Sequence, residues 1–378
     1  MMMEVAARPS KKNDLVDLDH IPVTTVRPQT CRQASILARS ADADTPNTGR
    51  QGPIMDHFVT GGAGFIGSWV VDRLAPRNKV TVYDNLSTGR EEFLQHHIGK
   101  KGFRFVKADL LDVETLLKEM KGHDSVWHMA ANPDIRLGTR STMVDLEQNT
   151  IATYNVLECA RRSDIRSVVF SSTSTVYGRA KTVPTPEDYG PLMPISLYGA
   201  SKLACEGLVS AYSELYGIRA HIFRFANIIG HRSTHGILYD LVHKLNEDPK
   251  RLEVLGDGKQ RKSYLLVEEC VDAMVYGFRH AKDQLNYFNL GAEDQVAVKR
   301  IVDILVEETG LEGVKVRYTG GESGWKGDVP RFLLSTKKMA KLGWKAKHTS
   351  EEAIREAAHI AVKEYLRPER TWRSVVRQ

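Results

Sequence analysis

Residues 59–74 have the sequence VTGGAGFIGSWVVDRL, which is the strongest indication of the fold. A β-branched run ends at Thr60, the glycines Gly61, Gly64 and Gly67 follow at intervals of three, and an amphipathic pattern comes next. Small residues let the backbone turn tightly and let a pyrophosphate approach the helix N-terminus, where free N–H groups and the helix dipole favour anions. Because a strand before the glycines and a helix after them are both visible, the stretch predicts a dinucleotide-binding turn.

The next strand pattern, KVTVYD, ends at Asp84, which lies 23 residues beyond Gly61. A carboxylate at this place accepts hydrogen bonds from the adenosine ribose hydroxyls and repels a 2′-phosphate. The spacing is close to the expected distance of about 20 residues. An ordinary turn at a strand end is the alternative interpretation, since YDNLSTG is rich in turn residues. We therefore expect NAD rather than NADP.

Outward from this stretch, short β-branched runs alternate with amphipathic segments. Strands are expected at 57–60, 79–83, 103–107, 125–128, 167–171 and 220–224, and helices at 64–74, 113–120, 143–162 and 198–216. Such alternation predicts right-handed βαβ units and a parallel sheet covered by helices on both faces. The fold class is therefore α/β, a Rossmann-type doubly wound parallel sheet.

After Asn227 the pattern changes. A loop, HRSTHG, precedes a further helix, and residues 252–267 (LEVLGDGKQRKSYLLV) form two strand-like pieces around a turn. Helices are then expected at 268–280, 299–309 and 350–365. We expect residues 55–228 to form the nucleotide-binding domain, with segments around 264–291 packing back on it, and 229–378 to form mostly a smaller α/β substrate lobe. In open α/β sheets, ligands bind at the carboxyl ends of the strands, where this lobe is expected.

Residues 1–55 differ in composition from the rest of the chain. They contain none of the Phe, Trp or Tyr residues and hold five of the 14 prolines, and the first aromatic residue is Phe58. A stretch of this kind cannot bury enough surface to offset its ordering entropy. We expect residues 1–54 to be a disordered extension, and Met55, directly before the first strand, is a candidate for the true start.

The charge and the cysteine content limit which partners and which cellular compartment are expected. Fifty-three Lys and Arg against 47 Asp and Glu give a net charge of +6, which suits phosphate-bearing small molecules and not nucleic acid, whose binders show a clustered basic face. No run approaches 18 apolar residues, so no membrane span is expected. The four cysteines show no CxxC spacing, and the N-terminus lacks a secretion signal. We therefore expect the protein to lie in the reducing cytoplasm. No metal site is expected, and the adjacent His96 and His97 are interpreted as surface residues.

Two motifs carry candidate chemistry. Tyr198 and Lys202, in YGASK, share one face of a helix at i, i+4 spacing. A phenol with a pKa near 10 is a poor base at neutral pH, and an adjacent cation lowers that pKa. The hydroxyl run FSSTSTVYG, residues 170–178, ends the fifth strand and presents Thr173 to a substrate oxygen. Turn capping is the alternative role for Ser171 and Ser172.

Six segments occur in a characteristic order: TGGAGFIG, YDNLSTGR, ADL, HMAANP, SSTSTVYG and YGASK. From Met55 to about Tyr365 the sequence resembles the NAD-dependent sugar-nucleotide epimerase/dehydratase family, the extended short-chain dehydrogenase/reductases, and within it the UDP-glucose 4-epimerases most. The resemblance implies that NAD is the cofactor, that a nucleotide sugar such as a UDP-hexose is the substrate, and that the protein is a homodimer formed by helices 143–162 and 198–216.

The resemblance also implies residue roles. Tyr198 would be the catalytic base, Lys202 would bind the nicotinamide ribose, Thr173 would be the hydroxyl partner, and Asn227 would contact the substrate. The implied NAD-binding residues are Gly61, Gly64, Phe65, Ile66 and Gly67 at the pyrophosphate, Asp84, Asn85, Ser87, Thr88 and Gly89 at the adenosine ribose, Asp109 and Leu110 at the adenine, and Ala130, Ala131, Asn149, Tyr198 and Lys202 along the rest of the cofactor.

Two positions depart from the epimerase pattern. Lys262 stands where the epimerases have an Arg that grips the diphosphate, with Arg261 next to it, and Trp325 stands where a second such Arg is common. Lys is a point charge and cannot form the bidentate clamp of Arg. Trp cannot make the charge contact, although it can stack on a sugar or a base. These departures leave the sugar-nucleotide class in place and weaken the choice of substrate.

Ser174 and Thr175 distinguish the subfamilies. Dehydratases carry Asp-Glu at this place and decarboxylases carry a Glu just before the Val, whereas this chain has no carboxylate there. The favoured interpretation is therefore a UDP-glucose/UDP-galactose 4-epimerase acting through a transient 4-keto intermediate. The alternatives are another sugar-nucleotide epimerase, such as a UDP-glucuronate 4-epimerase, a decarboxylase or oxidoreductase of the same family, and a non-catalytic NAD-binding scaffold.

Overall fold

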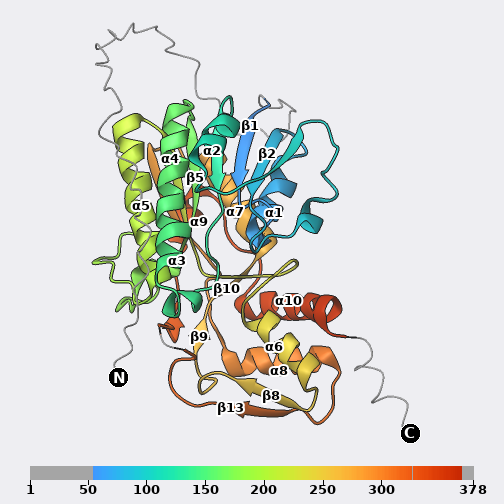
Figure 1. Ribbon diagram of the computed structural model, residues 1–378. Helices are drawn as coiled ribbons and strands as arrows, with labels where there is room; N and C mark the ends of the chain where they lie inside the picture. The colour runs from blue at the N-terminus through green and yellow to red at the C-terminus, as the bar shows by residue number, and fades with distance from the viewer. Residues whose placement is uncertain (1–53, 326, 368–378) are drawn as a thin grey trace, which may run out of the picture. The chain divides into compact units, whose positions relative to one another are not determined.

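A parallel β-sheet of seven strands forms the centre of the fold in the computed structural model, which describes residues 54–325 and 327–367 (Figure 1). The expected extension, apart from Ile54, lies outside the described residues. The strands of the sheet are β1 (Asp56–Thr60), β2 (Lys79–Asp84), β3 (Phe103–Lys107), β4 (Ser125–His128), β5 (Ser167–Thr173), β6 (Arg219–Phe225) and β11 (Leu285–Leu290).

The strand order is β11-β6-β5-β4-β1-β2-β3, and every pairing in this sheet is parallel. The direction of the order reverses between β1 and β4, which creates the topological switch point of a doubly wound sheet. The predicted fold class is confirmed. The loops that leave the carboxyl ends of β1, β4 and β5 meet at this point, so a ligand site is expected there.

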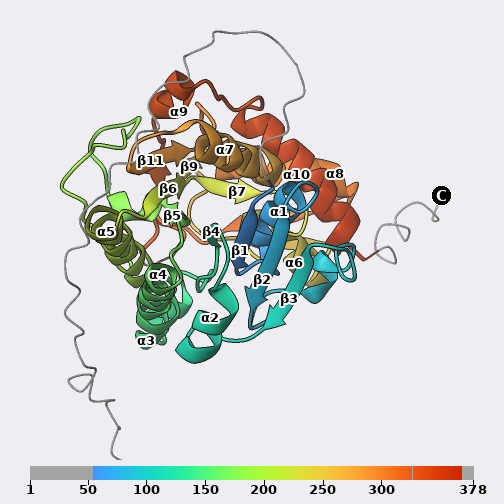
Figure 2. The ribbon, with the colours of Figure 1, turned by 90° about the horizontal axis from the view of Figure 1, so that it is seen from above.

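Helices cover both faces of the sheet (Figure 2). Alternate strand residues point to opposite faces, so Val59 packs with α1 (Phe65–Leu74) and α7 (Val267–His280), while Phe58 packs with the helices of the other face. Those other helices are α2 (Val113–Met120), α4 (Ala152–Arg162) and α5 (Leu197–Tyr216). Two separate hydrophobic cores therefore hold the sheet between its helical layers.

The seventh strand, β11, was not among the expected strands. Its sequence LNYFNL contains Asn286 and Asn289, which interrupt the apolar run that marks a buried strand. Both asparagines are buried and paired: Asn286 Nδ2 donates to the Ala220 carbonyl at 3.2 Å, and Asn289 Nδ2 donates to the Thr185 carbonyl at 3.0 Å. Tertiary hydrogen bonds, absent from any local pattern, make this strand possible.

The expected helix 143–162 is interrupted. It begins as α3 (Met143–Asp145), continues as a π-helical segment (Leu146–Ile151), and becomes regular only in α4. Single π-turns are rare and occur frequently at functional sites. This one contains Asn149, a residue of the candidate site.

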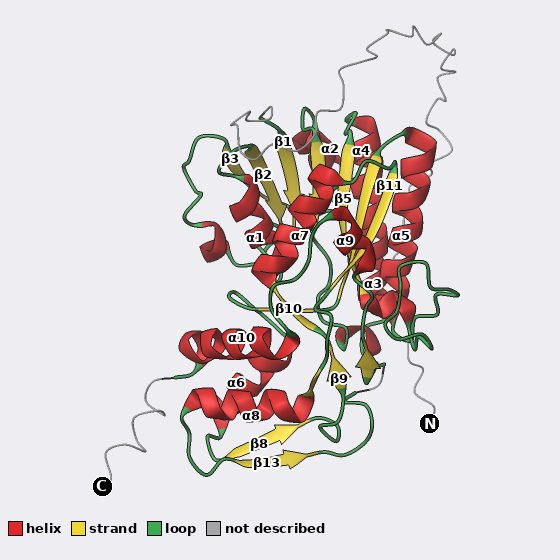
Figure 3. Ribbon diagram, turned by 180° about the vertical axis from the view of Figure 1, so that it is seen from behind, coloured by secondary structure: helices red, strands yellow, loops and turns green. Residues whose placement is uncertain are grey.

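A smaller lobe with its own core follows (Figure 3). Its helices are α6 (Ile237–Glu247), α8 (Val298–Thr309) and α10 (Ser350–Tyr365), with α9 (Lys337–Leu342) beside the main sheet. Short strands complete it: β7 (Asn227–Ile229) with β10 (Tyr264–Leu266), β8 (Arg251–Val254) with β13 (Lys315–Tyr318), and β12 (Val296–Ala297), β9 (Arg261–Lys262) and β14 (Arg331–Phe332).

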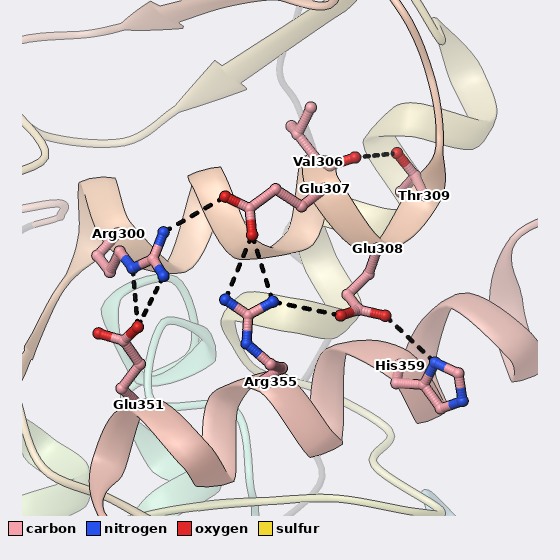
Figure 4. A network of polar contacts seen from close by, with 8 residues as sticks. All are labelled: Arg300, Val306, Glu307, Glu308, Thr309, Glu351, Arg355 and His359. Atoms are coloured by element: carbon pink, nitrogen blue, oxygen red, sulfur yellow. Dashed lines mark hydrogen bonds and ion pairs between the residues drawn. The ribbon is translucent and has the colours of Figure 1, made fainter.

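Ion pairs join α8 to α10 on the surface of the lobe (Figure 4). Arg300 contacts Glu351 at 2.7 Å, and Arg355 contacts Glu307 at 3.2 Å. Exposed pairs of this kind contribute about 0–1 kcal/mol each, so the buried apolar residues between the two helices dominate their association.

The described residues contain no helix that is long and apolar enough to cross a membrane.

Candidate functional site

The glycine turn between β1 and α1 brings backbone segments into close contact. Gly61 has a φ of +68°, and a Cβ there would lie 2.5 Å from the Ala130 nitrogen, so the turn passes directly against the segment after β4. A Cβ on Gly67 would lie 2.0 Å from the Gly61 carbonyl oxygen. Only glycine fits at these two places, which explains the spacing seen in the sequence.

The first turn of α1 has free donors. Its N-cap, Gly64, makes no side-chain hydrogen bond, and the first turn contains no acidic residue. The Ser68 N–H donates to the Gly64 carbonyl at 3.0 Å, so the N–H groups of Phe65, Ile66 and Gly67 precede the first bond of the helix. Donors of this kind, with the positive end of the helix dipole, match a pyrophosphate. The residues present therefore fit NAD.

Asp84 lies at the carboxyl end of β2, next to the glycine turn. Its Oδ2 accepts from the Ala63 N–H at 3.0 Å and its Oδ1 from the Leu86 N–H at 2.8 Å. Burial raises the pKa of this carboxyl group, and the two backbone bonds oppose that effect. Each oxygen keeps a further lone pair, so Asp84 is placed to accept from ribose hydroxyls as well.

The neighbouring loops form one polar wall. Asn85 Nδ2 donates to Asp109 Oδ2 at 2.9 Å, and Asn85 Oδ1 accepts from the Ser87 N–H at 2.9 Å. The Leu110 carbonyl accepts from Asn155 at 3.0 Å. The remaining candidates of this region are Thr88, which is exposed, and Gly89, Ala130 and Ala131, which are partly buried.

Thr173 and Tyr198 come together at the end of β5. Thr173 is the last residue of that strand, and Tyr198 lies in the first turn of α5, which Ser196 caps by accepting from the Gly199 N–H at 3.0 Å. A side-chain hydrogen bond joins Thr173 to Tyr198. The structure therefore brings together a phenol and a hydroxyl that are separated by 25 residues in the sequence.

Lys202 lies one helical turn further along α5 and is only 2% exposed. Its Nζ donates to the Ser171 carbonyl at 2.8 Å and sits 4.8 Å from the centre of the Phe170 ring. The ammonium group is thus held against the strand that carries Thr173. Burial lowers its pKa to about 8, while the charges of neighbouring acidic groups oppose this.

The expected lowering of the Tyr198 pKa is wrong for the protein alone. Burial raises the pKa of the phenol, the negative charge of Asp145 raises it further, and only the hydrogen bond with Thr173 lowers it. The phenol therefore stays protonated unless a bound group adds positive charge.

A buried amide and carboxylate network supports the first turn of α5. Asn149 Nδ2 donates to Ser201 Oγ at 2.9 Å, and Ser201 Oγ donates to the Tyr198 carbonyl at 2.8 Å. Asp145 Oδ1 accepts from Asn132 Nδ2 at 2.9 Å and from Asn149 Nδ2 at 3.2 Å. Sequence reasoning missed Asp145, whose signal is its i, i+4 spacing from Asn149.

Asp145 itself is unusual, because it is 1% exposed and its Oδ2 has no hydrogen-bond partner among the described residues. Burial raises the pKa of its carboxyl group. An unpaired buried carboxylate oxygen costs free energy, and the negative charge of Asp145 also raises the pKa of Tyr198.

A buried ion pair behind the site was also missed. Arg224 of β6 contacts Glu206 of α5 at 2.7 Å, and Glu206 accepts from the Ser172 hydroxyl. Arg224 also donates to the Tyr177 hydroxyl at 2.8 Å. Because both charges are buried, these bonds fix β5, β6 and α5 relative to one another, and with them Thr173, Tyr198 and Lys202.

The candidate substrate residues lie on the lobe side. Asn227, in β7, donates from Nδ2 to the Ser263 carbonyl at 3.2 Å. Lys262, in β9, forms an ion pair with Asp328, which partly offsets its charge. The Asp328 N–H donates to the Trp325 carbonyl at 3.1 Å, so one turn brings Trp325 and Lys262 into the same region.

Comparison with known proteins agrees with this geometry. The model of the NAD dependent epimerase/dehydratase family matches residues 57–291. A putative UDP-glucose 4-epimerase of Methanocaldococcus jannaschii is 32% identical over 309 residues, which cover 80% of this chain and 97% of that protein. A crystal structure of a UDP-galactose 4-epimerase is 41% identical with a TM-score of 0.74 and covers 82% of this chain and 99% of its own. A UDP-N-acetylglucosamine 4-epimerase from Methanobrevibacter ruminantium is 27% identical with a TM-score of 0.74, over 82% and 99% of the two chains.

Proposed function

The chain belongs to the NAD-dependent epimerase/dehydratase family, and from this premise we propose that it is a UDP-hexose 4-epimerase that interconverts UDP-glucose and UDP-galactose. Membership of this family makes the protein an NAD-dependent isomerase of nucleotide sugars. The observation that carries the proposal is the group of Thr173, Tyr198 and Lys202 at the end of β5, with no carboxylate in the turn that follows.

Bound NAD supplies the reversible hydride acceptor that this reaction needs. Tyr198 takes the proton of the sugar 4-hydroxyl as C4 is oxidised, and Thr173, hydrogen-bonded to that phenol, orients the reacting oxygen. Lys202 keeps its positive charge in the same buried region, against the Ser171 carbonyl, where it favours the phenolate once the site is filled. Reduction of the 4-keto sugar on its opposite face, with the proton returned by Tyr198, inverts C4.

The turn after β5 supports epimerisation over elimination or decarboxylation. Residues Ser174–Tyr177 form a single 3₁₀ turn whose first two side chains are hydroxyls. Expulsion of water from C5–C6 needs a general acid and base pair, and hydroxyls with their high pKa values do not serve. Oxidation, rotation and reduction at C4 need neither group.

The sugar is assigned from the relatives, which include UDP-glucose and UDP-galactose epimerases. The presence of a UDP-N-acetylglucosamine 4-epimerase among the similar structures makes UDP-N-acetylhexosamines the second candidate class. For the nucleotide end we propose Asn227, Lys262 and Trp325 as contacts, with Lys262 as the charged partner of the diphosphate.

A panel of sugar nucleotides tests the assignment. The purified protein is incubated with UDP-galactose, UDP-N-acetylglucosamine, UDP-glucuronate and dTDP-glucose, and the C4 epimers are separated by chromatography. We expect the highest kcat/KM for UDP-galactose, with UDP-glucose as the product and no net NADH. Faster turnover of another sugar would replace the sugar assignment, and no epimer from any substrate would contradict the proposed function.

We also propose a homodimer formed by α4 and α5, which pack side by side (Figure 1). Small residues lie exposed along α5 at helical spacing, namely Ala200, Ala204, Gly207 and Ala211. Leu146, Ile151 and Tyr154 are exposed on the neighbouring helical segment. A stripe of small residues beside exposed apolar side chains suits close helix packing against a second copy. Light scattering should give the mass of two chains.

A cytoplasmic location is inferred from the cysteines. Cys159, Cys205 and Cys270 are free and buried, and burial raises the pKa of each thiol. Unpaired, unreactive thiols suit a reducing compartment.

A further inference from the structure

Three potential metal ligands meet near the C-terminal end of α1. They are Asp72, near the end of that helix, and the adjacent histidines His96 and His97 in the connection between β2 and β3. The Nε2 atoms of His96 and His97 each lie 2.7 Å from the same oxygen, Oδ1 of Asp72. Within the described part of the chain, no other group of three such side chains meets so closely.

Both histidines were expected at the surface from the sequence, but only one of them lies there. His96 is half exposed, but His97 is only 6% exposed and stacks on the Phe103 ring at a centroid distance of 5.3 Å. The two imidazole rings are 4.1 Å apart. Packing therefore fixes His97, and through it the direction in which its Nε2 points.

The carboxylate is fixed from its other side. Arg232 contacts Asp72 Oδ2 at 2.8 Å, donates to Ser68 Oγ at 3.2 Å, and lies 5.1 Å from the centre of the Trp69 ring. Its backbone adopts a φ of +69°, a conformation that a non-glycine residue keeps only when its surroundings hold it. Such supporting contacts orient ligands in metal sites, and Arg232 leaves Oδ1 free to face the histidines.

We propose that Asp72, His96 and His97 form a binding site for a divalent transition-metal ion such as Zn²⁺. Two imidazole nitrogens and one carboxylate oxygen are ligands that Zn²⁺ accepts, with distances of about 2.0–2.2 Å to each. Three ligand atoms at mutual distances within 4.8 Å need only small side-chain movements to surround an ion, which replaces the protons now shared with Oδ1. The exposed edge of His96 leaves the fourth position to water.

The ion would link α1 to the β2–β3 connection and, through Asp72 and Arg232, to the loop that leads into the lobe. None of these residues belongs to the cofactor or substrate groups described above, so the site is separate from the reaction.

Titration of the full-length protein with Zn²⁺ tests the proposal. The protein, prepared without a polyhistidine tag and stripped with a chelator, is studied by calorimetry, and Co²⁺ is then added to record the visible spectrum of the bound ion. We expect one Zn²⁺ per chain, and an affinity at least tenfold weaker in both His96→Ala and His97→Ala. Because His96 is exposed, the His96→Ala variant should still fold and can test the site even if His97→Ala fails to fold.

The matched control is His359→Ala. His359 also pairs with a carboxylate, Glu308 at 3.2 Å, but has no second histidine beside it, so its removal should leave Zn²⁺ affinity unchanged. Absence of stoichiometric binding, or equal affinity in the wild type and in His96→Ala, overturns the proposal.

Discussion

Tyr198 sits in surroundings that favour the protonated phenol. Burial and the charge of Asp145 both raise its pKa, and the hydrogen bond with Thr173 only partly opposes them. A base that must give back the proton it takes benefits from such a balance, since a phenolate stabilised too strongly would return the proton slowly. We therefore expect Asp145 to affect the reaction through the pKa of Tyr198.

Replacing Asp145 by Asn should therefore shift the pH–rate profile. The negative charge of Asp145 raises the pKa of Tyr198, so its removal lowers that pKa and moves the rise of kcat to lower pH. Kcat measured with UDP-galactose between pH 5 and 10 checks this. Glu147→Gln, an exposed change two residues away, should leave the profile in place. An unmoved profile in Asp145→Asn would assign Asp145 a merely structural role.

Tyr198→Phe separates catalysis from cofactor binding. Loss of the phenol should lower kcat by at least about 10²–10⁴-fold, the usual contribution of a general acid–base group. The ring and the glycine turn remain, so the protein should still bind NAD, as measured from released nucleotide after denaturation. Wild-type turnover in this variant would remove Tyr198 from its proposed role.

Local spacing in the sequence revealed the candidate residues that lie at strand ends or at a fixed distance along the chain. Thr173, Tyr198 and Lys202 follow from a strand end and an i, i+4 helix pair, and Asp84 follows from its distance to the glycines. Glu206 and Arg224 could not be found in this way, because they lie on α5 and β6 and only the packing of the sheet brings them together. Asp145 lies four residues before Asn149, but its contact with Asn132 depends on the tertiary fold.

At the scale of elements, the β1–α1 turn limits what the sequence can tolerate. A Cβ on Gly67 would meet the Gly61 carbonyl oxygen at 2.0 Å, whereas a Cβ on Gly207 in α5 would meet no atom within 4 Å. The same substitution therefore meets backbone atoms at Gly67 and open space within the chain at Gly207.

Gly67→Ala should destabilise the fold by about 1–3 kcal/mol, because it overpacks the strand–helix contact, and should weaken NAD binding by at least tenfold. Gly207→Ala should instead leave NAD affinity unchanged, because within the chain its Cβ would meet no atom within 4 Å. Denaturant titration and NAD titration measure both effects. Equal stability of Gly67→Ala and wild type would show that the turn is looser than described.

Most elements of the main sheet and its covering helices followed from the period of the sequence, whereas the lobe's short elements β7, β12, β13 and β14 were not expected. Two exceptions in the sheet domain have a physical cause. The expected strands 57–60 and 125–128 lie within β1 and β4, where β-branched and aromatic residues mark a buried strand. Strand β11 was missed because Asn286 and Asn289 are satisfied only by tertiary partners. The π-helical segment at Leu146–Ile151 has no period of its own in the sequence.

At the scale of the molecule, the described residues bury their cores among themselves. The clusters on the two faces of the sheet and in the lobe are built from Phe58 onward. A chain that begins at Met55 should therefore fold and epimerise at the rate of the full-length protein. Circular dichroism and the UDP-galactose assay on residues 55–378 check this, and loss of folding would assign a structural role to the preceding segment.

In the proposed reaction, one chain oxidises and re-reduces the same C4 atom, and Tyr198 moves the proton. UDP-galactose that carries deuterium at C4 tests this most directly, with the UDP-glucose product analysed by mass spectrometry and NMR. We expect the deuterium to stay at C4 of the product in full, because the hydride returns to the sugar that gave it. Loss of the label to solvent, or its accumulation in released NADH, would rule out this reaction.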